Sequence, residues 1–160
     1  MTAVPPNQTH RKADALTSTS TDKQPTILVG YTPTPEGTAA LARATLEAKQ
    51  QGAHLAVLNT GKDGNYNDPV FATEQDIDAV DAQLTDADIP HSIHRPNDDL
   101  SAADSILNAA HDLAADLIVI GLRRRSPVGK LITGSTAQQV LLNANCPVLA
   151  VKAPRSSASN

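Results

Sequence analysis

The sequence predicts an α/β fold, in which an open, Rossmann-like parallel sheet of five strands carries helices on both faces. Three observations support this prediction. Five short β-like runs alternate with helix-like runs along the chain. The first, fourth and fifth runs are almost continuously apolar, which is typical of parallel strands covered on both faces. The segments between the runs repeat apolar residues at the spacing of an α-helix.

The predicted strands follow one another through right-handed crossovers. The third run is the shortest and alternates between polar and apolar residues, which favours an edge of the sheet, and the last run would form the other edge. We expect the strand order 3-2-1-4-5. The predicted strands are Thr26–Tyr31, His54–Thr60, His91–Arg95, Asp116–Gly121 and Pro147–Lys152.

Four predicted helices fill the segments between the strands. The first begins at Thr34 and Pro35 and ends at Gly52, residues that favour the two ends of a helix. The third has a capping-box-like start at Ser101, with Asp104 three residues later. The stripes expected to face the sheet are Ala40, Leu41, Ala44 and Ala48; Ile77, Val80, Leu84 and Ala87; Ala103, Ile106, Leu107, Ala110, Leu113 and Ala114; and Ala137, Val140, Leu141 and Ala144.

One domain accounts for most of the chain. The 160 residues suffice for one domain with a sizeable core and are too few for two. We expect residues 26–153 to fold, residues 1–25 to form a disordered extension, and residues 154–160 to form a flexible tail. No apolar run approaches the roughly 20 residues of a membrane span, and the first residues lack the apolar part of a signal peptide. The expected location is therefore the cytoplasm.

Charge is unevenly distributed along the chain. The net charge is −4, and residues 26–153 hold nine basic and fifteen acidic residues. Four of those nine lie in one loop: Arg123, Arg124, Arg125 and Lys130. This locally positive segment is where we expect an anion to bind. Nucleic acid is not the expected partner, because with two Tyr, one Phe and no Trp the chain offers few rings for base stacking.

The loop after the fourth predicted strand has the features of a phosphate site. Open parallel sheets bind ligands beyond the carboxyl ends of their strands, where the strand order reverses, which points to the loops after Tyr31 and Gly121. A helix follows Gly134, Ser135 and Thr136, whose amides would lie at its positive end. The alternative is that these residues form only a helix cap and that the arginines are solvated. Walker A and dinucleotide fingerprints are both absent from the sequence.

Residues 26–153 resemble the universal stress protein family. The resemblance rests on four segments in order: Ile27-Leu-Val-Gly-Tyr, Ala115-Asp-Leu-Ile-Val-Ile-Gly121, the pair Gly134-Ser135, and Asn145-Cys-Pro-Val-Leu-Ala-Val151. It implies a regulatory protein of the stress response that binds ATP or another adenine nucleotide, with Mg²⁺ left open. It also implies a homodimer through the strand Pro147–Lys152 and an unidentified regulatory protein partner.

The family's nucleotide motif is matched in part. ATP-binding members carry G-x-x-G, nine residues, and then G-S or G-T; Gly121, Gly134 and Ser135 match, whereas Arg124 replaces the second glycine. Thr32 stands where nucleotide-binding members often have aspartate. We expect Arg124, Arg125 and Lys130 to hold the phosphates through their side chains instead. The implied nucleotide site comprises Gly30, Tyr31, Thr32, Thr60, Ile120, Gly121, Arg123, Arg124, Arg125, Lys130, Gly134, Ser135, Thr136 and Ala137.

The remaining polar residues indicate neither a metal site nor a catalytic centre. His91 and His94, three apart on a strand, would point to opposite faces of the sheet and could not chelate one ion. Cys146 is interpreted as a small core residue. No carboxylate lies between Gly121 and Ala144 to hold a metal near the phosphates, so the sequence indicates at most a weak ATPase.

The rival hypothesis is a dimeric interaction module that binds no nucleotide and whose Arg-rich loop docks an acidic protein or RNA.

Overall fold

The computed structural model describes residues 23–60, 73–96, 99–122 and 134–154. They form a five-stranded sheet in the order β3-β2-β1-β4-β5, and all four strand pairs are parallel. The predicted fold class and strand order are confirmed. The strands are β1 (Thr26–Tyr31), β2 (His54–Asn59), β3 (His91–His94), β4 (Leu117–Leu122) and β5 (Val148–Lys152).

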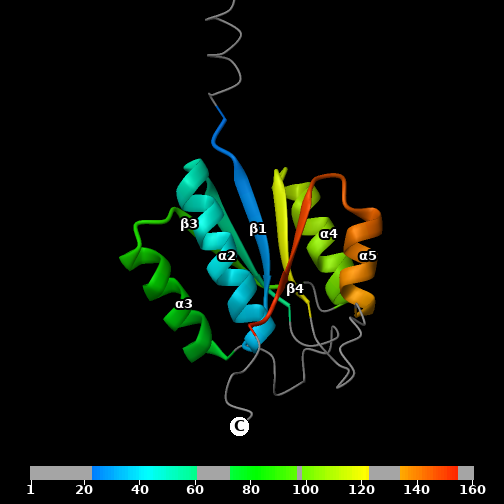
Figure 1. Cartoon of the computed structure of the whole chain (residues 1–160), viewed down its shortest axis with the longest axis horizontal. Helices are drawn as coiled ribbons and strands as arrows, with labels where there is room; N and C mark the ends of the chain where they lie inside the picture. Colours follow the sequence, from blue (N-terminus) through cyan, green and yellow to red (C-terminus); the bar gives the residue numbers. More distant parts are fainter. Residues whose placement is uncertain (1–22, 61–72, 97–98, 123–133, 155–160) are drawn as a thin grey trace, which may run out of the picture.

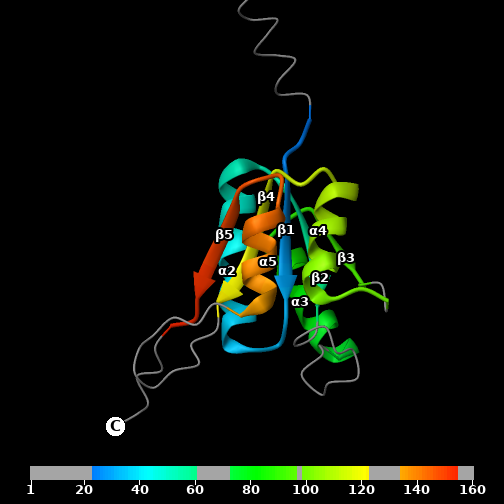
Figure 2. The ribbon, with the colours of Figure 1, turned by 90° about the vertical axis from the view of Figure 1, so that its right-hand side faces the viewer.

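Helices cover both faces of the sheet (Figures 1 and 2). On one face, α2 (Pro35–Gln51) and α3 (Glu74–Asp86) pack against alternate residues of the strands, including Ile27, Val29, Leu55 and Val57. On the other face, α4 (Ala102–Asp112) and α5 (Ser135–Asn143) pack against the intervening residues, including Leu28, Ala56, Ile118 and Ile120. The period-2 alternation of a strand thus supplies two cores from one sheet.

The ends of α2 are set by the residues that the sequence indicated. Thr34 caps the first turn by accepting a hydrogen bond from the Gly37 amide at 3.1 Å. Pro35 follows at the first helical position, where its missing N–H has no helical partner to lose. Gly52 ends the helix in the left-handed conformation, with φ of 61°. The predicted and observed helices agree at both ends.

Five of the predicted strand boundaries and two of the predicted core residues differ from the structure. β2 ends at Asn59 rather than Thr60, although the Thr60 amide still donates to the Tyr31 carbonyl at 3.0 Å. β3 ends at His94 rather than Arg95, β4 runs from Leu117 to Leu122 rather than from Asp116 to Gly121, and β5 starts at Val148 rather than Pro147. Ala114 was expected in the core stripe of α4, but it is exposed, because α4 ends at Asp112 and Ala114 takes a positive φ of 50° in the turn that follows. Leu141 was expected in the core stripe of α5, but it is 46% exposed, because Ala137 and Val140 supply the buried face of this short helix.

Candidate functional site

The candidate site lies where β1 and β4 end. The strand order reverses here, because β1 continues through α2 to β2 on one side and β4 leads to β5 on the other. Pairing between β1 and β4 ends at Val29 and Val119. Beyond that point β1 stays paired with β2 and β4 stays paired with β5. The two central strands therefore separate at their carboxyl ends, which is where open α/β sheets bind ligands.

Gly121 packs against α2 at this point. A Cβ on Gly121 would lie 2.4 Å from the carbonyl oxygen of Glu36, in the first turn of α2. The sequence suggested that this glycine lets a ligand approach the backbone. The structure shows that it also has a packing role. The absent side chain lets α2 pack directly on the end of β4.

Gly30 lies near the carboxyl end of β1, and Thr32 follows directly after that strand. A Cβ on Gly30 would lie 3.2 Å from the Cδ1 atom of Ile106 in α4, so Gly30 packs closely beneath that helix. The hydroxyl of Thr32 lies 2.8 Å from that of Thr34, the cap of α2. Either oxygen can be the donor, and Thr32 therefore takes part in the cap network of α2.

Tyr31 and Thr60 are joined through one carbonyl oxygen. The Thr60 amide donates to the Tyr31 carbonyl at 3.0 Å, and the Thr60 hydroxyl donates to the same oxygen at 3.3 Å. Both residues are buried. Burial raises the pKa of the Tyr31 phenol, and the negative charge of Asp76 in α3 raises it further. Tyr31 therefore stays neutral and acts as a packed side chain at the edge of the site.

Asn59 is a site residue that the sequence analysis missed. It is 3% exposed, stands opposite Tyr31 in the register of β1 and β2, and is the last residue of β2. The signal that could have found it is an amide at the end of an otherwise apolar strand, immediately before Thr60.

The amino end of α5 supplies the polar groups expected for a phosphate. Gly134 is the N-cap residue, with φ of −61°, so its backbone conformation does not require glycine. A Cβ at this position would meet no atom of the described residues within 4 Å. Ser135 is exposed and Thr136 half-buried, whereas Ala137 is buried in the same core as Ile120. The first turn of α5 is thereby fixed to β4, with its amides at the positive end of the helix.

The four cations of the predicted site lie outside the described residues. They are Arg123, Arg124, Arg125 and Lys130. The described part of the predicted site is gathered at the carboxyl ends of β1, β2 and β4 and the amino end of α5. It comprises Gly30, Tyr31, Thr32, Thr60, Ile120, Gly121, Gly134, Ser135, Thr136 and Ala137.

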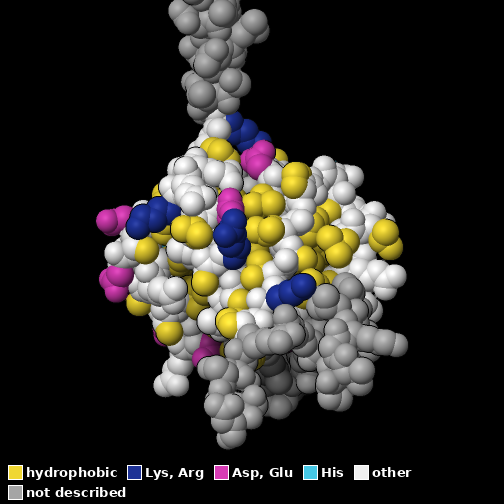
Figure 3. Space-filling view, in the orientation of Figure 1, with side chains coloured by type: hydrophobic (Ala, Val, Ile, Leu, Met, Phe, Trp, Pro, Cys, Tyr) yellow, Lys and Arg dark blue, Asp and Glu magenta, His cyan; other side chains and the backbone are white. Residues whose placement is uncertain are grey.

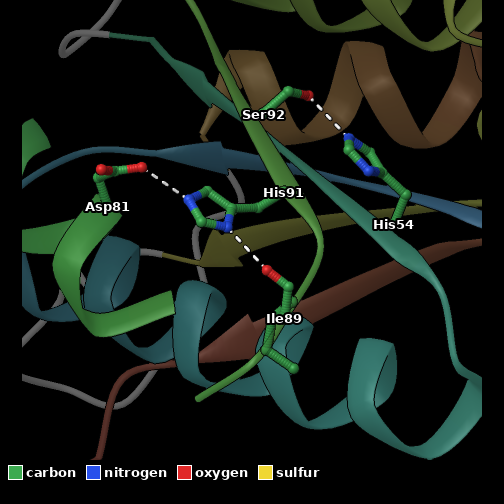
Figure 4. Close-up of polar contacts among 5 residues, drawn as sticks. All are labelled: His54, Asp81, Ile89, His91 and Ser92. Carbon is green, nitrogen blue, oxygen red and sulfur yellow. Dashed lines mark hydrogen bonds and ion pairs between the residues drawn. The ribbon is translucent and has the colours of Figure 1, made fainter. Parts of the chain in front are cut away.

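Histidines form a second polar cluster on β2 and β3 (Figure 4). The Nε2 atom of His54 lies 2.9 Å from the Ser92 hydroxyl, which also lies 2.8 Å from Nε2 of His94. His91 instead contacts Asp81 of α3. Within the described ranges, no three His, Cys, Asp or Glu side chains are arranged to hold a metal ion. No helix in that part of the chain is long and apolar enough to cross a membrane.

Cys146 packs against the core shared by α4 and α5 and is half-buried. Burial raises the pKa of its thiol, and the nearby Asp116 carboxylate raises it further. The thiol form therefore dominates at neutral pH, which agrees with the interpretation of Cys146 as a packing residue.

The fold and the site define a Rossmann-like α/β protein in which the amino end of a helix lies beside the point of strand reversal. Residues 25–152 match the sequence model of the universal stress protein family. A universal stress protein of Mycolicibacterium smegmatis is 41% identical over 126 residues, which cover 79% of this chain and 96% of the relative. A Thermus aquaticus relative, "Universal stress protein in QAH/OAS sulfhydrylase 3'region", is 33% identical over 134 residues, covering 79% of this chain and 98% of the relative. The chain belongs to the universal stress protein family.

Solved structures show the same architecture. The universal stress protein from Archaeoglobus fulgidus superposes with a TM-score of 0.58 at 29% identity, over 81% of this chain and 99% of that one. A second structure from that organism, in complex with dAMP, has a TM-score of 0.58 at 22% identity, over 81% and 98% of the two chains.

Proposed function

We propose that this protein binds an adenine nucleotide, with ATP as the first candidate, and acts as a regulatory protein in the stress response. Family membership supports the stress-related role. Related structures hold dAMP, cAMP and AMP, the last in a universal stress protein family protein of Arabidopsis thaliana.

The observation that carries the proposal is the positive end of α5 at the point where β1 and β4 separate. Phosphates bind at helix amino ends because unpaired amides and the helix dipole both favour negative charge there. Gly134 supports this placement, since neither its φ angle nor the packing of the described residues requires a glycine. A bare backbone at this position leaves room for a phosphate.

We place the sugar and base along the ends of β1 and β2, beside Gly30, Tyr31, Thr32 and Thr60. The phosphates then extend to Gly134, Ser135, Thr136 and Ala137. Side chains of Arg123, Arg124, Arg125 and Lys130 would add charge-assisted hydrogen bonds of about 1.5–3 kcal/mol each. Because such contacts are electrostatic, the affinity for ATP should fall as salt is added.

A direct test is to denature the purified protein and examine the supernatant by absorbance and mass spectrometry. Released adenine nucleotide supports the proposal. Where none is released, calorimetry at low ionic strength with ATP, ADP, AMP and cAMP decides the question. The absence of heat with all four nucleotides would contradict nucleotide binding.

A second candidate function is favoured by the hydrogen bonds of two threonines. The Thr32 hydroxyl pairs with Thr34, and the Thr60 hydroxyl donates to the Tyr31 carbonyl. Both groups that would recognise a ribose are thus used within the protein. On this alternative, the chain is a dimeric interaction module that binds no nucleotide, and its Arg-rich loop docks an acidic protein or RNA. Pull-down by an acidic peptide without any nucleotide binding would favour it.

We also propose a homodimer through Pro147–Lys152, in a cytoplasmic protein that passes its ligand state to a regulatory partner. β5 is an edge strand whose residues Val148, Leu149, Ala150 and Val151 are only half-buried. Figure 3 shows hydrophobic side chains gathered over the middle of the face where Figure 1 places α2 and β5. An apolar edge strand favours pairing with another chain. Light scattering at tens of micromolar should give twice the chain mass, whereas a monomer mass would contradict the dimer.

A further inference from the structure

His91 is held between two hydrogen-bond acceptors (Figure 4). Its Nδ1 atom lies 2.7 Å from the carbonyl oxygen of Ile89, and its Nε2 atom lies 2.7 Å from Oδ1 of Asp81. The His91 side chain is 11% exposed, so water has little access to replace either partner. Asp81 belongs to α3, whereas His91 opens β3, and the contact therefore joins a helix to the edge of the sheet.

The two acceptors determine the charge of the imidazole ring. A carbonyl oxygen and an ionised carboxylate accept hydrogen bonds and donate none. Both contacts can be hydrogen bonds only when Nδ1 and Nε2 each carry a proton, which makes the ring an imidazolium cation. The neutral ring carries one N–H and must lose one of the two bonds. Burial by itself would lower the pKa of His91, but the bonds to Ile89 and Asp81 together outweigh it and raise that pKa.

α3, which contacts His91, is strongly acidic and lightly packed. The helix has five carboxylates and no basic residue over Glu74–Asp86. Only two of its side chains, Val80 and Leu84, are buried, compared with five residues of α2. Its other ion pair, between Glu74 and Arg95, is long at 3.8 Å and highly exposed at both ends, so it contributes little.

Other titratable groups surround His91 from the neighbouring strands. His54 of β2 lies near enough for charge on His91 and His94 to lower its pKa, with burial as the larger cause. His54 and His94 share the Ser92 hydroxyl on the opposite face of the sheet. Since the pKa of His54 is lowered and that of His91 is raised, His54 loses its proton before His91. Among the described residues, Asp81 is the charged group in hydrogen-bond contact with His91.

We propose that the imidazolium of His91 is a proton-dependent latch that holds α3 on the edge strand β3, and that α3 opens more readily when this ring loses its proton. The latch strengthens as the pH falls toward the ordinary range of histidine and weakens as the pH rises through the titration of His91. Asp76, in the first turn of α3, lies near Tyr31 of the candidate nucleotide site. Opening of α3 therefore changes the surroundings of Tyr31. The latch itself requires no nucleotide.

Hydrogen exchange of the full chain, read by mass spectrometry, tests the latch without any ligand. The protection factors of α3, corrected for the intrinsic pH dependence of exchange, should fall between about pH 6 and pH 9. The protection factors should fall on the order of tenfold. This is the low end of the effect of a hydrogen bond to a charged group, because Asp81 is 60% exposed and solvent weakens the contact. Peptides from β1 and β4 serve as the internal reference and should not change.

Two variants and a matched control separate the latch from simple packing. Asp81→Asn keeps an acceptor but removes the charge, so it should shift the midpoint of the α3 transition to lower pH. His91→Gln should give low protection of α3 at every pH. Asp78→Asn, an equal change of charge at an exposed position of the same helix, should behave like the wild type.

Nitrogen NMR of the His91 ring provides the direct readout of its charge. Two protonated ring nitrogens near pH 6 are expected from the geometry. A neutral ring at that pH, or α3 protection that does not change across the titration of His91, would overturn the proposal. The outcome is independent of nucleotide binding, so the two proposals can fail separately.

Discussion

Gly121 and Glu36 touch through their backbones: a Cβ on Gly121 would lie 2.4 Å from the Glu36 carbonyl oxygen. This contact joins the end of β4 to the first turn of α2, the two elements that bound one side of the candidate site. It gives one of the family's motif glycines a structural role as well as any role in ligand binding. Gly134, the other matched glycine, has no such neighbour among the described residues.

Replacing these two glycines should therefore have different effects. Gly121→Ala should lower the free energy of unfolding by roughly 1–3 kcal/mol, because the added methyl group must displace α2. Gly134→Ala should change it by less than about 1 kcal/mol, because its φ of −61° suits alanine. Urea denaturation of both variants provides the measurement. Equal losses of stability in the two would contradict the assigned roles.

Acid should destabilise the fold through His54. The pKa of His54 is lowered by burial first and then by the charges of His91 and His94. The unfolded chain, in which histidine titrates near about 6.5, therefore binds this proton more readily. The contribution is fully present above that pH and is lost as the pH falls toward the lower folded pKa.

The variant His54→Gln should reduce this sensitivity to acid. Glutamine can still hydrogen-bond the Ser92 hydroxyl, but it takes up no proton. The loss of unfolding free energy between about pH 7 and pH 5 should be smaller in the variant than in the wild type. His111→Gln, at an exposed position in the last turn of α4, is the control. An equal loss of unfolding free energy between about pH 7 and pH 5 in the wild type and in His54→Gln would be inconsistent with this explanation.

Cys146 should react slowly with alkylating reagents. Burial and the Asp116 carboxylate both raise its pKa, so little thiolate is present at neutral pH. The rate of reaction with iodoacetamide should rise with a midpoint above about 8.5, the ordinary value for cysteine. Asp116→Asn should move the midpoint down, although it also weakens the bond that Asp116 accepts from the Thr26 amide at 2.9 Å. A wild-type midpoint below the ordinary value would refute this account.

The fold could be predicted because its determinants are local. Continuous apolar runs marked β1, β4 and β5, and Thr34, Pro35 and Gly52 marked both ends of α2. The helical spacing of apolar residues predicts the buried side chains less well for α5, which has nine residues and buries only Ala137 and Val140. Leu141 has the spacing of a core residue but is exposed, because a short helix packed on a sheet buries only a narrow stripe of side chains.

The site could be predicted only as a set of positions. Sequence spacing placed Gly121 and Gly134 correctly at a strand end and a helix start. It could not show that Gly121 contacts α2, that Thr32 and Thr60 already have hydrogen-bond partners, or that His54 meets His94 through Ser92. These contacts join residues that are distant in sequence or on neighbouring strands, and they depend on register and side-chain rotamer.

The central claim, phosphate binding at the start of α5, is tested most directly by calorimetry of ATP with the variant Ser135→Asp. A carboxylate in the first turn should preserve or slightly raise helix stability, by about 0.3–1 kcal/mol, while repelling a phosphate. Gln139→Glu, which adds the same charge at an exposed position farther along α5, is the control. The account predicts that the wild type and Gln139→Glu bind ATP at low ionic strength and that Ser135→Asp binds at least tenfold more weakly, on the order of 1.4 kcal/mol, without loss of stability. ATP binding of equal strength in all three proteins would contradict it.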